Sequence, residues 1–303
     1  MHLQIKTKMP KALFSPNFLG IEEPELYQYE PARIVVQSLP YEYTSSYLSG
    51  SAAGPEAILN ASHYVEFYDE ELAREVYRET GIATLEPLDF GKKTNEAAVA
   101  LIEEATTSLL EDGKFVVSLG AEHTVTYGIV RAFARKFDQL TVLQLDAHSD
   151  LRESYQDNPY SHASVMKRIY DLGLNICQAG IRAQCREEAE LIRESDRIHT
   201  AYAWKLQNDP SWIENLVNAC SENVYITIDA DGFDPSVMPA VGTAEPGGLG
   251  WYEALGLLRT VFEKKNVVGF DIVECAPAKD NIITEFNLAK LAYKLMGYKF
   301  TRV

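Results

Sequence analysis

The amino-acid sequence predicts an α/β protein in which a mostly parallel sheet of about eight strands lies between two layers of helices, a three-layer α-β-α arrangement. Apolar segments rich in β-branched residues recur along the 303-residue chain. Segments with apolar residues at helical spacing separate them. Several of the predicted strands are apolar throughout, which is typical of a parallel sheet buried on both faces.

The predicted strands include the runs FVVSLG and LTVLQLD, which lack the alternation of a half-exposed strand. The eight segments are 33–41, 82–90, 115–120, 140–148, 175–182, 198–204, 224–233 and 267–275. The predicted helices cover 54–65, 95–113, 124–137, 161–173, 185–195, 210–222, 251–264 and 284–298. This alternation indicates right-handed crossovers, with ligand sites at the carboxyl ends of the strands.

We expect residues 1–303 to form a single domain, because no repeat, linker or low-complexity tract interrupts the pattern. The weakly patterned stretch 1–32 is expected to pack on the surface or on a neighbouring subunit. No apolar run approaches the roughly 20 residues that cross a bilayer, and no secretory signal follows Met1. These features favour a cytoplasmic protein.

The net charge of the chain limits the kinds of partner that are expected. With 28 basic and 44 acidic residues the formal net charge is −16. Nucleic acids and anionic membranes are bound through basic patches, so neither is an expected partner. A small cationic ligand fits better, although an acidic balance is also common among proteins with no such ligand.

Two of the predicted strands end in closely spaced ligand-type residues. In LQLDAHSD, Asp146, His148 and Asp150 alternate along the chain, so their side chains face one way while the backbone stays extended. YITIDAD places Asp229 and Asp231 at the end of another apolar strand. Carboxylates brought together there would repel one another unless divalent cations bind between them.

A third strand, in SLGAEH, is followed by a glycine turn and His123, while the neighbouring Glu122 is expected to support a ligand or to start a helix. Each motif alone has an ordinary interpretation, as solvated loop acids or a capping histidine. Together they predict a metal site, and the oxygen and imidazole donors suit Mn²⁺ better than Ca²⁺ or structural zinc. The predicted ligands are His123, Asp146, His148, Asp150, Asp229 and Asp231.

These motifs resemble the ureohydrolase family of arginases and agmatinases. The family patterns GGDHS, DAHxD, SxDxDxxDP with GTGTPxxGG, and DxVExxP appear here in order. They take the forms GAEHT, DAHSD, TIDADGFDP with VGTAEPGG, and DIVECAP. The early segment LPYEYTSSYLSGSAAGPEAI is similar to the agmatinase form of the family, so the resemblance is closer to agmatinases than to arginases. It implies an arginase/deacetylase-like fold.

The resemblance implies two Mn²⁺ ions per subunit. His123, Asp146, Asp150 and Asp229 would bind one, and Asp146, His148, Asp229 and Asp231 the other, so that Asp146 and Asp229 bridge. A hydroxide between the ions would attack the guanidinium carbon, because two cations lower the pKa of a shared water. Asp150 is counted among the catalytic residues for this reason.

Further site residues come from the same resemblance. Glu274 in DIVECAP matches the glutamate that pairs with the guanidinium, and His162 in YSHASVM matches the histidine that moves protons to the leaving amine. Thr243 in VGTAEPGG is expected to contact substrate. Without the resemblance, Glu274 would be interpreted as a surface acid and His162 as a first-turn histidine.

This chain also departs from the family pattern. Ala121 and Glu122 replace the usual Gly-Asp, Val241 stands where threonine is frequent, and Ala244 replaces a proline. An arginine is missing at positions 48–50. None of these departures removes a predicted metal ligand, so they bear on substrate orientation.

The loop LRESYQDNPYSH guides the prediction of the substrate. It carries Glu153 and Asp157 but only Arg152 as a basic residue, which favours an amine-tailed guanidine over arginine. Agmatine, giving putrescine and urea in polyamine biosynthesis, is the first prediction, with Glu153 and Asp157 as amine contacts or solvated loop acids. N1-aminopropylagmatine, giving spermidine and urea, is the alternative, and guanidinobutyrate, arginine, formiminoglutamate and guanidine also compete.

Two other classes remain open: a single-zinc deacetylase-like enzyme, and a non-catalytic homologue. The complete second set of ligands distinguishes this sequence from the deacetylases. By resemblance a homo-oligomer, a trimer or hexamer, is expected.

Overall fold

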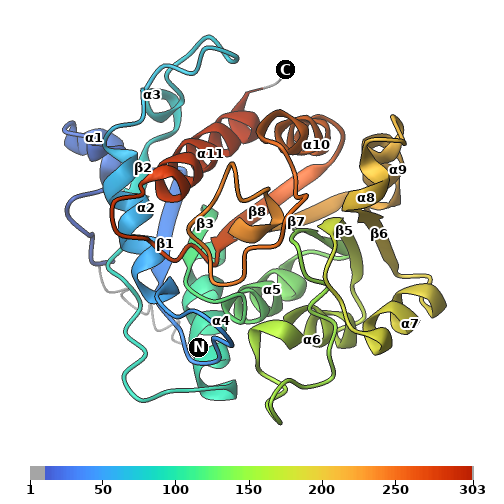
Figure 1. Ribbon diagram of the computed structural model, residues 1–303. Coiled ribbons are helices and arrows are strands. Elements are labelled where there is room, and N and C mark those ends of the chain that lie inside the picture. The colour runs from blue at the N-terminus through green and yellow to red at the C-terminus, as the bar shows by residue number, and fades with distance from the viewer. Residues whose placement is uncertain (1–10, 302–303) are drawn as a thin grey trace, which may run out of the picture.

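The computed structural model describes residues 11–301, and its centre is one sheet of eight parallel strands in the order β2-β1-β3-β8-β7-β4-β5-β6 (Figure 1). The strands are β1 (Ile34–Leu39), β2 (Ile82–Thr84), β3 (Phe115–Gly120), β4 (Leu140–Leu145), β5 (Asn175–Ile181), β6 (Ile198–Tyr202), β7 (Asn223–Asp229) and β8 (Asn266–Val273). Each of the seven strand pairings is parallel.

Helices cover both faces of this sheet, and each layer encloses its own hydrophobic core (Figure 1). One layer consists of α2 (Gly54–Ser62), α9 (Trp212–Ala219), α10 (Trp251–Lys264) and α11 (Ile283–Phe300). The other consists of α4 (Glu96–Glu111), α5 (Val125–Lys136), α6 (Val165–Asp171) and α7 (Arg186–Glu194). The three-layer prediction is confirmed.

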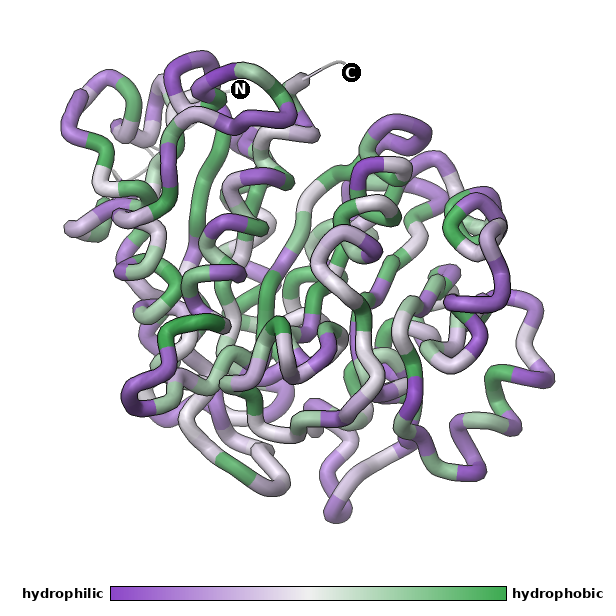
Figure 2. Tube along the Cα trace, turned by 45° about the horizontal axis from the view of Figure 1, so that its top comes forward, coloured by the Kyte–Doolittle hydropathy of each residue, from purple (hydrophilic) through white to green (hydrophobic). Residues whose placement is uncertain are grey.

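The sheet forms because its interior strands are buried on both faces. Every residue of β1, β3 and β4 is buried, whereas the edge strand β6 is partly exposed along most of its length. Figure 2 shows hydrophobic residues along the central strands and hydrophilic residues gathered in the outer turns. The apolar runs of the sequence therefore mark the strands that lie deepest in the fold.

The predicted strands were too long at their carboxyl ends. β2 stops at Thr84, β4 at Leu145 and β8 at Val273, because the following residues turn into loops that carry polar side chains. The short helices α1 (Pro24–Tyr27), α3 (Val76–Thr80) and α8 (Ala203–Leu206) were not predicted, since four or five residues give too few turns for an apolar period.

The segment 11–32 is packed into the chain's own fold. Phe18 and Leu19, in the 3-10 turn η1 (Phe18–Gly20), are buried in the core, and their backbone N–H groups donate to Thr84 and Ser62. The first ten residues of the predicted N-terminal extension lie outside the described residues. Within the described part, no helix combines the length and the apolar character that a bilayer crossing requires.

Candidate active site

The site lies where the four middle strands of the sheet, β3, β8, β7 and β4, end. His123 sits in the turn between β3 and α5, Asp146 directly follows β4, Asp229 closes β7, and Glu274 directly follows β8. Because parallel strands end at the same edge of a sheet, residues 151 positions apart in the chain meet here.

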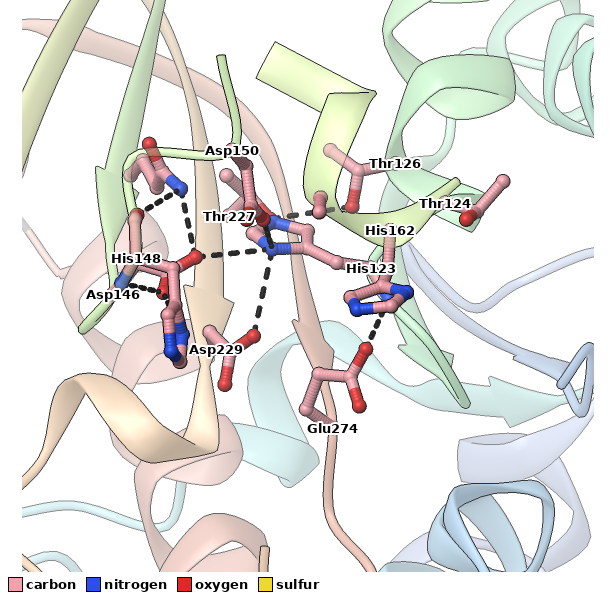
Figure 3. Close-up of polar contacts among 12 residues, drawn as sticks. His123, Thr124, Thr126, Asp146, His148, Asp150, His162, Thr227, Asp229 and Glu274 are labelled. Atoms are coloured by element: carbon pink, nitrogen blue, oxygen red, sulfur yellow. Dashed lines mark hydrogen bonds and ion pairs between the residues drawn. The ribbon is translucent and has the colours of Figure 1, made fainter. Parts of the chain in front are cut away.

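His123 is the centre of one cluster of ligand-type atoms (Figure 3). Its Nδ1 lies 3.1 Å from Asp146 Oδ2, 3.0 Å from Asp150 Oδ2 and 3.5 Å from Asp229 Oδ2. Its other nitrogen, Nε2, lies 2.9 Å from the hydroxyl of Thr227, which in turn donates to Asp271 at 2.6 Å. The ring is thus held from behind with Nδ1 facing three carboxylates.

A second cluster surrounds His148. Its Nδ1 lies 3.1 Å from Asp231 Oδ2 and 3.6 Å from Asp146 Oδ1. The ligand atoms of His123, Asp146 and Asp150 lie within 4.8 Å of one another, and so do those of Asp146, His148 and Asp231. Asp146 belongs to both clusters, which is the arrangement expected of a bridging ligand.

The backbone reaches this geometry by a route that the sequence analysis did not predict. The prediction that residues 140–148 stay extended is wrong: β4 ends at Leu145, and Asp150 has φ +53°. His148 N–H donates to Asp146 Oδ1 at 2.6 Å. The loop therefore curls around the Asp146 carboxylate, and Asp150 meets His123 through the curl rather than through strand alternation.

Two buried glutamines support the shared carboxylate. Gln144 Nε2 donates to Asp146 Oδ2 at 2.7 Å, and Gln178 Nε2 donates to Gln144 Oε1 at 2.7 Å. Thr200 on the edge strand completes the chain by donating to Gln178 Oε1 at 2.8 Å. This relay crosses β4, β5 and β6 and fixes the orientation of each amide.

The carboxylates of the two clusters lie close together and are shielded from water, and both conditions shift the pKa values of the site residues. Burial, together with the charge of Asp146, raises the pKa of Asp150 to about 7. Burial and the charges of Asp231 and Asp146 raise the pKa of Asp229 well above its usual range. Burial opposes the protonated form of His148, but hydrogen bonds to Asp146 and Asp231 outweigh it and raise the pKa to about 12.

These residues fit divalent cations. His123 Nδ1 is buried and has no hydrogen-bond partner although three carboxylates face it. A cation between that nitrogen and those oxygens supplies the missing partner and removes the repulsion that raises the carboxylate pKa values. With Asp146 shared, the six predicted ligands provide two such positions, built from oxygen and imidazole donors.

Glu274 stands beside the first cluster (Figure 3). Its backbone has φ +62°, its N–H donates to Ala121 O at 2.7 Å, and its Oε1 accepts from His123 N–H at 2.7 Å. Burial, together with the neighbouring Glu122, raises the pKa of Glu274 to about 8. A buried carboxylate in this state gains most from a cationic partner such as a guanidinium.

His162 lies in the 3-10 turn η3 (His162–Ser164), whose N-cap Ser161 accepts from Ala163 N–H. Thr44 Oγ1 is 3.0 Å from His162 Nδ1, and Tyr155 meets the ring edge-on with centroids 5.9 Å apart. Burial, together with the charges of His123 and His148, lowers the pKa of His162 to about 4.

An open cleft of about 320 Å³ leads down to the clusters. His148, Asp150, His162 and Thr243 line both this cleft and the narrow space of about 30 Å³ below it. Thr243 Oγ1 also donates to Asp231 Oδ2 at 3.1 Å. The outer walls of the cleft include Arg152, Tyr155, Gln184, Glu188 and Glu245.

Glu153 does not reach this cleft. Its carboxylate lies 2.6 Å from Arg168 and 2.9 Å from Lys167, and its side chain is 72% exposed. The structure gives no support for Glu153 as an amine contact, because its carboxylate pairs with two cations of α6 and does not line the cleft. Asp157 is likewise absent from the residues that line the cleft.

The sequence analysis missed the glutamine relay, Thr44 and Glu245. Gln144 and Gln178 are single polar residues inside apolar strands, and no local pattern separates them from ordinary strand residues. Thr44 lies 118 residues from His162 in the chain. Glu245 lies in the segment VGTAEPGG, which the family resemblance assigned to the site. Its position in that loop could have indicated a role in the site.

Comparison with known proteins agrees with this geometry. The sequence model described as the arginase family matches residues 32–297. The chain belongs to the arginase family. It is 45% identical, over 284 residues and 92% of each chain, to the N(1)-aminopropylagmatine ureohydrolase of Synechocystis sp.. It is 35% identical to the agmatinase of Bacillus anthracis, over 84% of this chain and 87% of the relative.

Among solved structures, the agmatine ureohydrolase of Thermoplasma volcanium superposes with a TM-score of 0.80 at 32% identity, covering 94% of this chain and 95% of that one. The match extends over nearly the whole chain. The resemblance stated from the motifs is thereby confirmed.

Proposed function

We propose that this arginase-family chain is a dinuclear manganese ureohydrolase that cleaves an amine-tailed guanidino compound into urea and an amine. Its first substrate is N1-aminopropylagmatine, which gives spermidine, and its second is agmatine, which gives putrescine. The observation that carries this proposal is the pair of buried clusters that share Asp146 at the floor of a cleft, with Glu274 beside them.

Manganese is proposed because the donors are carboxylates and imidazoles without thiolates. His123, Asp146, Asp150 and Asp229 would hold one ion, and Asp146, His148, Asp229 and Asp231 the other. When bound, such a pair supplies activation of water near neutral pH.

The chain's own residues then bind and orient the substrate. The two oxygens of Glu274 match the planar fork of a guanidinium, which places the carbon to be attacked above the clusters. His162 lines both the cleft and its floor, so its ring can exchange a proton with the leaving nitrogen. Thr243 lines the same cleft and donates a hydrogen bond to Asp231.

The substrate tail lies in the outer cleft in this proposal. Glu245 lines that region and offers a carboxylate to a distal ammonium. Agmatine was the first prediction from sequence, but four relatives at 35–45% identity are named N(1)-aminopropylagmatine ureohydrolase. Their names favour the longer substrate.

The test is a urea-release assay after loading with Mn²⁺. N1-aminopropylagmatine should have the highest kcat/KM and agmatine the next, with arginine, guanidinobutyrate, formiminoglutamate and guanidine at least tenfold lower. Highest activity with arginine would overturn the substrate assignment. If none of these compounds yields urea, and one tightly held zinc accompanies deacetylase activity, the enzyme class is wrong.

A cytoplasmic location and a trimeric or hexameric assembly belong to the same proposal. They are supported by the resemblance to agmatinases, and size measurement in solution tests the assembly. Nucleic acids and membranes are not proposed as partners, in keeping with the net charge of −16.

A further inference from the structure

The hydroxyl of Thr44 contacts His162 twice. Thr44 Oγ1 accepts from the backbone N–H of His162 at 3.1 Å and lies 3.0 Å from its ring nitrogen Nδ1. A hydroxyl has one hydrogen and two acceptor positions, so one acceptor position is used by the backbone N–H and the second remains available for a ring N–H.

These contacts suit both charge states of the imidazole. In the neutral ring, Nδ1–H donates to the second acceptor position of the Thr44 hydroxyl, and Nε2 is unprotonated. In the charged ring, the same contact persists and Nε2 also carries a proton. Either way Nδ1 stays bound to Thr44 and Nε2 is the nitrogen left for the cleft that His162 lines.

Ser161 reinforces this side of the ring. Its Oγ lies 3.4 Å from His162 Nδ1 and accepts from Ala163 N–H at 3.4 Å. Thr44 is the nearer of the two hydroxyls, and it comes from a different part of the chain. It therefore joins two segments of the site that the sheet alone does not connect.

Thr44 is itself fixed by a buried acid. Glu122 Oε2 accepts from Thr44 N–H at 2.6 Å and from Tyr43 N–H at 2.9 Å. Glu122 is fully buried and precedes His123 at the end of β3. Thr44 is thus anchored to the turn after β3, which also positions the proposed metal ligand His123. The following loop residues, 45–50, are exposed.

We propose that Thr44 is a positioning residue for His162: it binds Nδ1 through a proton-transfer cycle and so keeps Nε2 directed into the cleft. In that cycle Nε2 takes a proton from solvent water in the cleft and gives it to the leaving amine nitrogen, while Nδ1–H stays on Thr44 Oγ1 throughout. The kinetic consequence rests on the proposed function, whereas the hydrogen bond itself does not.

The first experiment needs no activity. In the full chain labelled with ¹⁵N-histidine and loaded with diamagnetic Mg²⁺, at a pH where the ring is neutral, His162 should show a protonated Nδ1 and an unprotonated Nε2. The His162→Asn variant identifies its signals. Thr44→Val should show a mixture of both tautomers. An unprotonated Nδ1 in the wild type, or an unchanged spectrum in Thr44→Val, would overturn the proposal.

The second experiment follows urea release. Thr44→Val should lower kcat about tenfold, with KM changed less than about twofold, since it removes one hydrogen bond from a proton-carrying group. Thr44→Ser should restore kcat to within about twofold, and Ser49→Ala, on the same exposed loop, should leave it unchanged.

A double-mutant comparison separates positioning from loop damage. In the His162→Asn background, Thr44→Val should cost no further activity, because the residue through which Thr44 acts is gone. An equal tenfold loss in both backgrounds would show a merely structural role. If the wild type releases no urea, the proposed function fails, and the nitrogen spectrum still decides the role of Thr44.

Discussion

The carboxylate of Glu245 lines the outer cleft, while its backbone carbonyl accepts hydrogen bonds from Arg182. Among residues 11–301 no cation forms a direct ion pair with this carboxylate, and Arg182 acts on it only through its charge at longer range. A polyamine tail would provide one. The backbone contacts to Arg182 hold Glu245 in position, so a substrate that pairs with it needs little rearrangement of the loop.

We predict that Glu245→Gln raises KM for N1-aminopropylagmatine about tenfold and changes kcat little, because one charge-assisted contact to the tail is lost. The matched control is Glu153→Gln, which removes a loop acid that lies outside the cleft and should leave both constants unchanged. Steady-state urea release measures them. Equal effects of the two substitutions would show that Glu245 does not contact the tail.

Glu274 should act on a different kinetic constant. Glu274→Gln retains the size of the side chain but removes the charge that faces the guanidinium, so kcat/KM should fall about a hundredfold. The metal content, determined by elemental analysis of the same samples, should stay the same. Unaltered kcat/KM in a variant that keeps its metal would refute the assignment of the guanidinium to Glu274.

The pKa shifts predict how pH changes metal binding. The pKa of Asp150 is about 7 in the folded protein, against about 3.9 in an unfolded chain, so the metal-free fold binds the extra proton between these values. Its stabilising contribution is therefore complete at low pH and is lost as pH rises towards 7. A metal ion competes with that proton and binds better at higher pH.

We therefore expect the rise in melting temperature caused by Mn²⁺ to increase from pH 6 to pH 8.5, measured at fixed metal concentration by scanning fluorimetry or calorimetry. Asp150→Asn should reduce both the rise and its pH dependence. A rise that is larger at pH 6 than at pH 8.5 would contradict the linkage between metal and proton.

At the scale of elements, the relay from Thr200 through Gln178 to Gln144 connects three strands to the shared ligand. Hydrogen bonds behind a ligand fix its orientation and tune its affinity for metal. The relay is fully buried at both glutamines, so its geometry cannot be replaced by water without opening the sheet.

Gln144→Leu should weaken Mn²⁺ binding by about ten- to a hundredfold, measured by competition with a chelator of known affinity. The matched control is Gln37→Leu. Gln37 is also a buried glutamine within the sheet, but its amide donates to Thr106 and Ser118 and touches no ligand. The Gln37→Leu variant should be less stable but should bind Mn²⁺ with unchanged affinity. Similar losses of Mn²⁺ affinity in both variants would show that the relay has no specific role.

The elements also show where sequence reasoning succeeds. Continuous apolar runs predicted the strands, and ligand spacing predicted that Asp146, His148 and Asp150 meet. The predicted backbone path was wrong. Instead of continuing as a strand, the chain turns at Asp150, which has a positive φ, and His148 N–H donates to the Asp146 carboxylate. The local sequence does not determine such a turn. The turn depends on the Asp146 carboxylate around which the loop folds and on the neighbouring strands.

Other parts of the site depend on contacts that only the fold creates. Thr44 and His162 are 118 residues apart, and Glu274 and His123 are 151 apart. Glu274 was predicted through the family motif DIVECAP. Thr44 lies in the early segment LPYEYTSSYLSGSAAGPEAI, but nothing in that segment indicated His162 as its partner. The ion pairs of Glu153 with Lys167 and Arg168 likewise could not be inferred from the loop sequence.

At the scale of the whole molecule, the parallel sheet brings the carboxyl ends of four middle strands together, and the site is the place where they meet. The carboxylates gathered there are unfavourable for a protein without cations, since burial and mutual repulsion raise the pKa values of Asp150 and Asp229. Two divalent ions would convert this unfavourable cluster into a stable and chemically useful centre.

The number of bound metal ions tests this account most directly. Purified chain, stripped with a chelator and then equilibrated with Mn²⁺ by dialysis, should retain two ions per chain by elemental analysis. Asp231→Asn should retain the ion held by His123 and lose most of the other. A wild-type chain that saturates at one ion, or binds none, would contradict the dinuclear site.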